Sequence, residues 1–160
     1  AANDQRHETL GTDETFWDWS INVNLRSYFF ACQSVIPGMQ AAGGGSIINF
    51  SSISFMMADT GYAAYITANA GIVGLTRTLA REFGPDRIRV NAVAPGWVLT
   101  ERQKEMWVTP EALANHLARQ CLPDPIQPGD VAGTVLFLAS NASRMMTSQT
   151  LVLDGGYISG

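Results

Sequence analysis

Residues 46–51 read SIINFS and residues 88–94 read IRVNAVA, and these two short apolar runs decide how the chain folds. The first follows the triple glycine Gly43–Gly45, and the second is stopped by Pro95-Gly96. Short apolar runs bounded by such turn residues are typical of buried strands. A third run covers residues 151–153 and is ended by an Asp-Gly-Gly turn. We therefore predict three short buried strands.

Helical patterns fill the chain between these strands. We predict helices over residues 14 to about 42, with a kink at Pro37, over 62–83, from Thr109-Pro110 onward, and over 128 to about 140. Strands that alternate with helices are typical of a parallel sheet with helices packed on its faces. The pattern therefore predicts an α/β fold, with residues 1–160 forming a single domain.

The composition argues against several classes of protein. Of the 160 residues, 46% are hydrophobic and 15% are charged, which is typical of a globular domain and not of a disordered chain. A net charge of −4 argues against a nucleic-acid partner, and no apolar run is long enough to span a membrane. Cys32 and Cys121 are too few for a disulfide scaffold, so a cytoplasmic location is expected. No Cys/His cluster predicts a metal site, and His7 and His116 are expected on the surface.

Polar side chains follow the first predicted strand, where a parallel sheet binds its ligands. Ser51, Ser52 and Ser54 come directly after this strand, and Tyr65 lies near the start of the next helix. A serine and a tyrosine in these places can share one substrate, with the serine stabilising an oxygen and the tyrosine exchanging its proton. The same residues also fit plainer roles, the serines as turn residues and the tyrosine as part of the core.

Several motifs, in order along nearly the whole chain, resemble those of the short-chain dehydrogenase/reductase family. The matching pieces are Val23-Asn24-Leu25, GGSIINFSS at 44–52, YITANAGIVGLTRTLARE from Tyr65, RIRVNAVAPG at 87–96, PGWVLT at 95–100 and LVLDGG at 151–156. The resemblance implies a Rossmann-like fold. It also implies an oxidoreductase that transfers a hydride between a small-molecule substrate and NAD or NADP.

The resemblance implies roles for individual residues as well. Tyr65 would exchange a proton with the substrate oxygen, Ser52 would hydrogen-bond the same oxygen, and Asn24 would hold a water in the proton relay. The residues expected at the nicotinamide end of the cofactor are Phe50, Ser51, Tyr65, Asn69, Pro95, Gly96, Val98 and Thr100.

One departure from the family concerns the cofactor. The family's Thr-Gly-x3-Gly-x-Gly turn, which binds the pyrophosphate, is missing from these 160 residues. We therefore expect the fold to lack its N-terminal cofactor-binding half here, as in a truncated chain, and NAD cannot be distinguished from NADP.

The second departure concerns catalysis, because the family's Tyr-x3-Lys is Tyr65-x3-Asn69 here. A unit charge at about 5 Å with an effective dielectric near 20 is worth about 3 kcal/mol, or about two pKa units. Asn69 can bind a ribose hydroxyl but carries no charge. We therefore expect the pKa of Tyr65 to stay near its ordinary value of about 10, and the chain alone to be inactive.

The substrate is indicated by a narrower resemblance. AANDQRHETL, APGWVLTERQ and RQCLPD resemble the sugar-oxidising members of the family, which implies oxidation of an aldose such as galactose at C1 to a lactone. Asn3, Ser54 and Arg102 are then expected to bind sugar hydroxyls, with Trp97 packing on the ring. In the plainer interpretation these are solvated loop residues and a tryptophan that caps the core.

Three functions remain open at this point. The chain is part of a sugar or alcohol dehydrogenase, a catalytically silent relative that acts as an interaction protein, or a carbohydrate-binding domain. We also expect a homo-oligomer, for two reasons. The helix that carries Phe29 and Phe30 resembles one that pairs between subunits in the family, and the strand at 46–51 is expected at a sheet edge.

Overall fold

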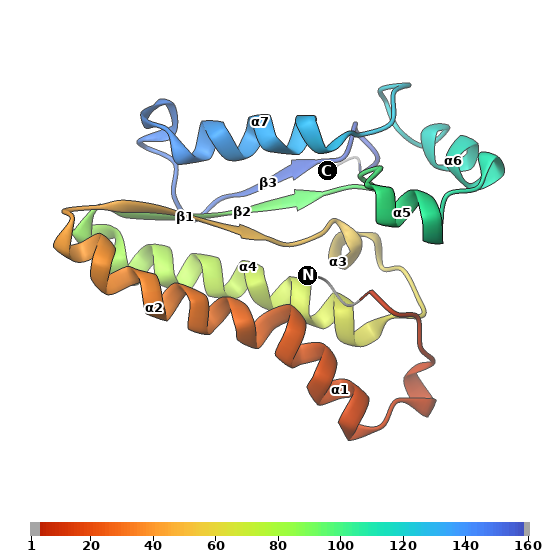
Figure 1. Ribbon diagram of the computed structural model, residues 1–160, viewed down its shortest axis with the longest axis horizontal. Helices are drawn as coiled ribbons and strands as arrows, with labels where there is room; N and C mark the ends of the chain where they lie inside the picture. Colours follow the sequence, from red (N-terminus) through yellow and green to blue (C-terminus); the bar gives the residue numbers. More distant parts are fainter. Residues whose placement is uncertain (1–3, 159–160) are drawn as a thin grey trace.

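The computed structural model describes residues 4–158 and confirms the parallel sheet (Figure 1). The strands are β1 (Gly45–Phe50), β2 (Ile88–Pro95) and β3 (Thr150–Leu153), in the order β1-β2-β3. Gly45 lies opposite Ile88 in the first parallel pair, and Ala92 lies opposite Thr150 in the second. β2 is therefore the central strand, and β1 lies at an edge of the described sheet, as the sequence predicted.

Helices cover both faces of this sheet. They are α1 (Glu14–Ile21), α2 (Ser27–Ala41), α3 (Ser54–Met57), α4 (Ala63–Phe83), α5 (Glu101–Met106), α6 (Pro110–Leu117) and α7 (Pro128–Ala139). In Figure 1, α2 and α4 pack below the sheet, α7 lies above it, and α5 and α6 lie beyond the carboxyl ends of the strands. The α/β alternation read from the sequence is thus confirmed, whereas the short helices α3 and α5 were not predicted.

The first predicted helix differs from its expected form. Asp13 caps it by accepting a 2.7 Å hydrogen bond from the backbone N–H of Phe16. The α-helical pattern is then replaced by a π-helical segment, Asn22–Arg26, and α2 continues from there through Pro37. Insertions of this kind are frequent at functional sites. This one contains Asn24, which is buried and donates from Nδ2 to Ser20 Oγ at 3.3 Å.

The core surrounds the central strand. Val90, Ala92 and Val93 of β2 are completely buried. Asn49 of β1 donates from Nδ2 to Thr76 Oγ1 of α4 at 3.0 Å, and both side chains are buried. Because burial makes an unsatisfied polar group costly, this hydrogen bond fixes how α4 lies against β1.

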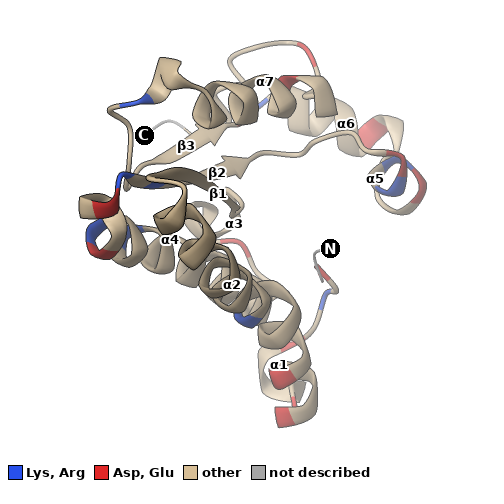
Figure 2. Cartoon of the chain, turned by 60° about the vertical axis from the view of Figure 1, so that its left-hand side comes forward, with Lys and Arg blue, Asp and Glu red and all other residues tan. Residues whose placement is uncertain are grey.

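Charged residues lie mainly on helices and loops. In Figure 2, Lys and Arg are interspersed with Asp and Glu around the outside of the sheet. In the part of the chain that the structure describes, no helix is long and apolar enough to cross a membrane. No group of three or more His, Cys, Asp or Glu in the same residues is arranged to hold a metal ion.

Replacing Thr76 with Val tests the contact between α4 and β1. The change removes the acceptor of the Asn49 amide while keeping the volume of the side chain, so we expect the free energy of unfolding to fall by about 1–3 kcal/mol. Urea denaturation provides the measurement. Thr78 of the same helix is exposed, so Thr78→Val is the matched control and should change stability by less than about 0.5 kcal/mol. Equal losses in the two variants would contradict this role of the hydrogen bond.

Candidate active site

A cavity of about 560 Å³ opens at the carboxyl ends of the strands. It is built from segments far apart in the sequence: the N-terminal segment, the loops after β1 and β2, the start of α4, α5, α6 and the turn after β3. The residues that line it are Asp4, Arg6, Ser52, Ile53, Ser54, Met57, Asp59, Tyr62, Tyr65, Gly96, Trp97, Val98, Thr100, Gln103, Trp107, His116 and Tyr157. This is the edge of the sheet at which the sequence predicted a site.

Ser52 and Tyr65 both line this cavity because a hydrogen bond joins the residue after β1 to the N-terminal part of α4. Ser51, directly before Ser52, is buried and donates from Oγ to the backbone carbonyl of Asn69 at 2.9 Å. Asn69 in turn donates from Nδ2 to the backbone carbonyl of Tyr65 at 2.9 Å, across one helical turn. The first contact holds the opening turns of α4 against the end of β1, and the second lies within α4 between Asn69 and Tyr65. Both hydroxyl side chains line one cavity as a result.

The Tyr65 hydroxyl is a weak acid in this environment. Burial raises the pKa of Tyr65 above its usual range, and this effect outweighs the hydrogen bonding with Ser52 and Asn69 that lowers it. A desolvated phenolate is costly unless a cation lies beside it. The sequence predicted a pKa near the ordinary value, and the structure places it higher. A raised pKa of Tyr65 is consistent with Asn69, because an asparagine supplies no positive charge to stabilise the phenolate.

The loop after β2 forms a second wall. Gly96, Trp97, Val98 and Thr100 line the cavity. A Cβ at Gly96 would lie 3.0 Å from both Cα and Cβ of Asp154, so any side chain there would push against the turn after β3. The loop ends where the Thr100 side chain accepts from the backbone N–H of Gln103 at 3.3 Å and so caps α5.

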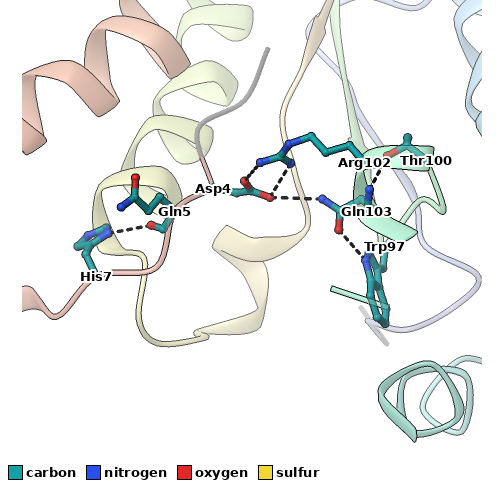
Figure 3. A network of polar contacts seen from close by, with 7 residues as sticks. All are labelled: Asp4, Gln5, His7, Trp97, Thr100, Arg102 and Gln103. Carbon is teal, nitrogen blue, oxygen red and sulfur yellow. Dashed lines mark hydrogen bonds and ion pairs between the residues drawn. The ribbon is translucent and has the colours of Figure 1, made fainter. Parts of the chain in front are cut away.

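A polar network joins the N-terminal segment to α5 (Figure 3). Asp4 accepts hydrogen bonds from Arg102, at 2.7 Å to Oδ1 and 3.3 Å to Oδ2, and from Gln103 Nε2 at 3.3 Å. Gln103 Oε1 also accepts from Trp97 Nε1 at 2.8 Å. Arg102 was predicted to bind a sugar hydroxyl. In the structure its guanidinium pairs with Asp4, and it is not among the residues that line the cavity, so sugar binding by Arg102 stays a prediction.

Aromatic rings form the far end of the cavity. His116 stacks on Tyr157, with ring centroids 4.4 Å apart, and meets Trp97 edge to face at 5.2 Å. Asp154 accepts from the backbone N–H groups of Gly156 and Ile158, each at 2.8 Å, and so holds the turn that carries Tyr157. Burial lowers the pKa of His116, which favours the neutral ring. The expectation that His116 lies on the surface away from the site was therefore wrong.

The structure brings together some of the predicted site residues and separates others. The cavity is lined by Ser52, Ser54, Tyr65, Gly96, Trp97, Val98 and Thr100 and not by Asn24, Phe50, Ser51, Asn69, Pro95 or Arg102. Asn3 lies outside the described residues. Ser51 and Asn69 do not line the cavity, but their hydrogen bonds position the first turns of α4 beside it. Asn24 is buried in the π-helical segment, and the side chain of Phe50 is exposed.

Sequence reasoning missed the rim of the cavity. Asp59 accepts from the Tyr62 hydroxyl at 2.8 Å, and the Arg6 guanidinium lies 3.9 Å from the centre of the Tyr62 ring. These residues belong to no motif with a fixed spacing. The only signal was their position in loops that follow strands or precede helices, where α/β folds place their ligands.

Comparison with known proteins shows the family. The family described as enoyl-(acyl carrier protein) reductase matches residues 1–158. The chain belongs to the short-chain dehydrogenase/reductase family, as its motifs indicated.

The relatives include sugar dehydrogenases. The chain is 51% identical over 156 residues to a protein of Rhizobium meliloti named "Probable galactose dehydrogenase", and 49% identical over 157 residues to a D-xylose 1-dehydrogenase of Caulobacter vibrioides. Each match covers 98% of this chain but only 61% and 63% of the relative, so the chain spans about three-fifths of their length. A solved 4-hydroxyisoleucine dehydrogenase complexed with NADH superimposes with a TM-score of 0.93 at 29% identity, covering 100% of this chain and 66% of that one.

Proposed function

We propose that this chain forms the substrate-binding and catalytic part of an NAD(P)-dependent oxidoreductase that oxidises an aldose. The observation that carries the proposal is the pairing of Ser52 and Tyr65 in one cavity at the carboxyl edge of the sheet. A serine hydroxyl and a phenol that reach the same oxygen are suited to move one proton to or from an alcohol.

The residues present fit the nicotinamide end of a cofactor. Gly96, Val98 and Thr100 line the cavity beside Tyr65, and their loop is held by a hydrogen bond from Gly96 N–H to the carbonyl of Leu153 at 2.8 Å. These residues would hold the nicotinamide, which supplies the acceptor for a hydride when it is bound. The described sheet and its loops offer no counterpart to the glycine-rich turn for the pyrophosphate, so nothing in residues 4–158 distinguishes NAD from NADP.

In the proposed reaction this chain's own residues handle the proton. Ser52 donates a hydrogen bond to the substrate oxygen and holds the hydroxyl toward Tyr65. Tyr65, as the phenolate, takes the hydroxyl proton while the carbinol carbon loses its hydride. The alcohol thereby loses two electrons and becomes a carbonyl, or a lactone when the carbon is C1 of a pyranose.

Asn69 makes this step slow. Burial keeps Tyr65 protonated at neutral pH, and no ammonium at position 69 offsets it. We therefore expect weak catalysis. A protein that binds its ligands without turnover, the silent relative considered from the sequence, is the alternative that the first experiment below separates from the proposal.

An aldose suits the lining of the cavity. Polar groups from Asp4, Ser54 and Gln103 line it together with the rings of Trp97 and His116. A pyranose offers hydroxyl groups around its edge and C–H groups on its faces. The sugar names of the relatives point the same way.

Replacing Asn69 with Lys, in the protein as its complete gene encodes it, tests the proposal. We expect aldose-dependent reduction of NAD⁺ or NADP⁺ to accelerate by about two orders of magnitude, because a charge one helical turn from Tyr65 recovers most of an effect of about 3 kcal/mol. The pH at which the rate rises should also fall by about two units, because a lowered pKa of Tyr65 makes the phenolate available at lower pH. Initial rates at 340 nm across pH give both results.

Two variants complete this experiment. Asn69→Met has the length of lysine without its charge and should not accelerate the reaction, and Tyr65→Phe in the lysine background should abolish it. Equal rates for the Asn and Lys proteins at every pH would refute the account of position 69. Turnover that persists without the Tyr65 hydroxyl would refute the proposed reaction.

We further propose that the chain self-associates through α2 and α4. An apolar groove of about 390 Å³ is lined by Ile21, Leu25, Arg26, Phe29, Phe30, Gly71 and Leu75. Phe29 and Phe30 are 44% and 46% exposed, although contiguous apolar surface is usually covered in soluble proteins. A second copy with the same groove would cover it.

Phe29→Glu is expected to weaken this association by placing a charge in the groove. Sedimentation at micromolar concentration should show the 17.3 kDa chain as a dimer or larger species and the variant shifted toward monomer. Leu136→Glu on α7 is the control, because Leu136 is 70% exposed on the opposite face of the sheet. A monodisperse monomer of the unaltered chain would show that this groove does not mediate association.

A further inference from the structure

We propose that Asp4 determines specificity for polyhydroxylated substrates by accepting a hydrogen bond from a substrate hydroxyl that does not react. The inference rests on the proposed function and assigns recognition to a side chain other than Ser52 and Tyr65, the proposed proton-transfer residues. It gives Asp4 a role that Arg102 was expected to fill from the sequence.

The geometry makes the Asp4 carboxylate an acceptor that faces the cavity. Its side chain is 24% exposed, and it is held from one direction by Arg102 and Gln103 of α5. Two of the three contacts from these side chains are long, at 3.3 Å, and one of them comes from the neutral Gln103 amide. An incoming hydroxyl can replace that contact at little cost, since a carboxylate accepts in several directions and prefers short bonds.

Gln103 links this acceptor to the aromatic wall. Its Nε2 donates to Asp4, and its Oε1 accepts from the Trp97 indole at 2.8 Å (Figure 3). The indole is thereby fixed in the cavity lining, with the His116 ring edge to face against it. A ring that carries hydroxyl groups on its edge and C–H groups on its face needs both features at once, and here one side chain sets their relative position.

A second, independent observation indicates a polar ligand in the same cavity. Ser54 is 4% exposed and lines the cavity, yet its buried Oγ has no hydrogen-bond partner among residues 4–158. A buried hydroxyl without a partner is costly, so a ligand group that pairs with it after a rotation of the Ser54 side chain gains affinity. The Asp4 carboxylate can only accept a hydrogen bond, whereas the Ser54 hydroxyl can accept or donate one, so both suit hydroxyl groups of a ligand.

The competing explanation is that Asp4 only ties the N-terminal segment to α5 through Arg102. Two variants separate the explanations. Asp4→Asn keeps the shape of the side chain and removes the charged acceptor. Arg102→Met breaks the ion pair and leaves the carboxylate at the cavity. A merely structural role predicts the same effect for both variants, whereas a recognition role predicts different effects.

The test is calorimetric binding of D-galactose, D-xylose and their monodeoxy analogues to the protein as its complete gene encodes it. We expect one monodeoxy analogue to bind the unaltered protein about tenfold more weakly than its parent sugar, as for a lost hydrogen bond to a charged group. Asp4→Asn should reduce that difference to within about twofold, because the partner of the deleted hydroxyl is already gone. Arg102→Met should keep most of it.

Several outcomes would overturn the inference. An unchanged pattern in Asp4→Asn, or an equal collapse of the pattern in both variants, shows that Asp4 does not read a hydroxyl. Neither outcome affects the proposed function, which hydride transfer tests separately. If no aldose binds the unaltered protein, the inference fails, and oxidation of other secondary alcohols then decides whether the proposed oxidoreductase function stands.

Discussion

The attachment of α4 to β1 is the constraint on which the site depends. Two buried contacts make it, from Asn49 to Thr76 near the end of the strand and from Ser51, directly after the strand, to the Asn69 carbonyl. The first sets how the helix lies on the sheet. The second holds its opening turns level with the residue that follows the strand. Ser52 and Tyr65 therefore line the same cavity, although they belong to different segments of the chain.

The parts of this arrangement that periodicity encodes were predictable. IRVNAVA forms a strand whose side chains are buried on both faces of the sheet, whereas SIINFS is buried on one face, through Ile47 and Asn49, and exposes Phe50 on the other. The glycines and prolines beside the two runs end the strands. The π-helical segment around Asn24 was not predictable, because the hydrogen-bond register of a helix leaves no mark in its apolar pattern. Asp4, Gln103 and His116 were missed for another reason. They come from three segments that only the folded chain brings together, and each looks like an ordinary surface residue in its own stretch of sequence.

Position 69 shows how one side chain separates fold from chemistry. The Asn69 side chain donates a hydrogen bond to the backbone carbonyl of Tyr65, and the backbone carbonyl of Asn69 accepts one from the Ser51 hydroxyl. The backbone around Tyr65 is therefore held in place without a lysine. What the amide does not supply is charge. Burial therefore outweighs the hydrogen bonding with Ser52 and Asn69 and raises the pKa of Tyr65. A complete fold with a weakened acid–base residue is therefore self-consistent, because packing depends on shape and hydrogen bonds, whereas proton transfer depends on the electrostatic environment.

The two sides of the cavity differ in how firmly they are held, and this difference suits a site whose substrate varies within one fold. The reacting side is anchored by contacts buried between β1 and α4. The recognition side is held by an ion pair whose Arg102 side chain is 50% exposed, which is worth at most about 1 kcal/mol, and by an amide that links Asp4 to Trp97. Substitutions at the recognition side thus cost little stability while changing which hydroxyl groups find a partner. A relative can in this way keep the serine and tyrosine and change its substrate through Asp4, Gln103 and the rings around them, without disturbing the sheet that positions the chemistry.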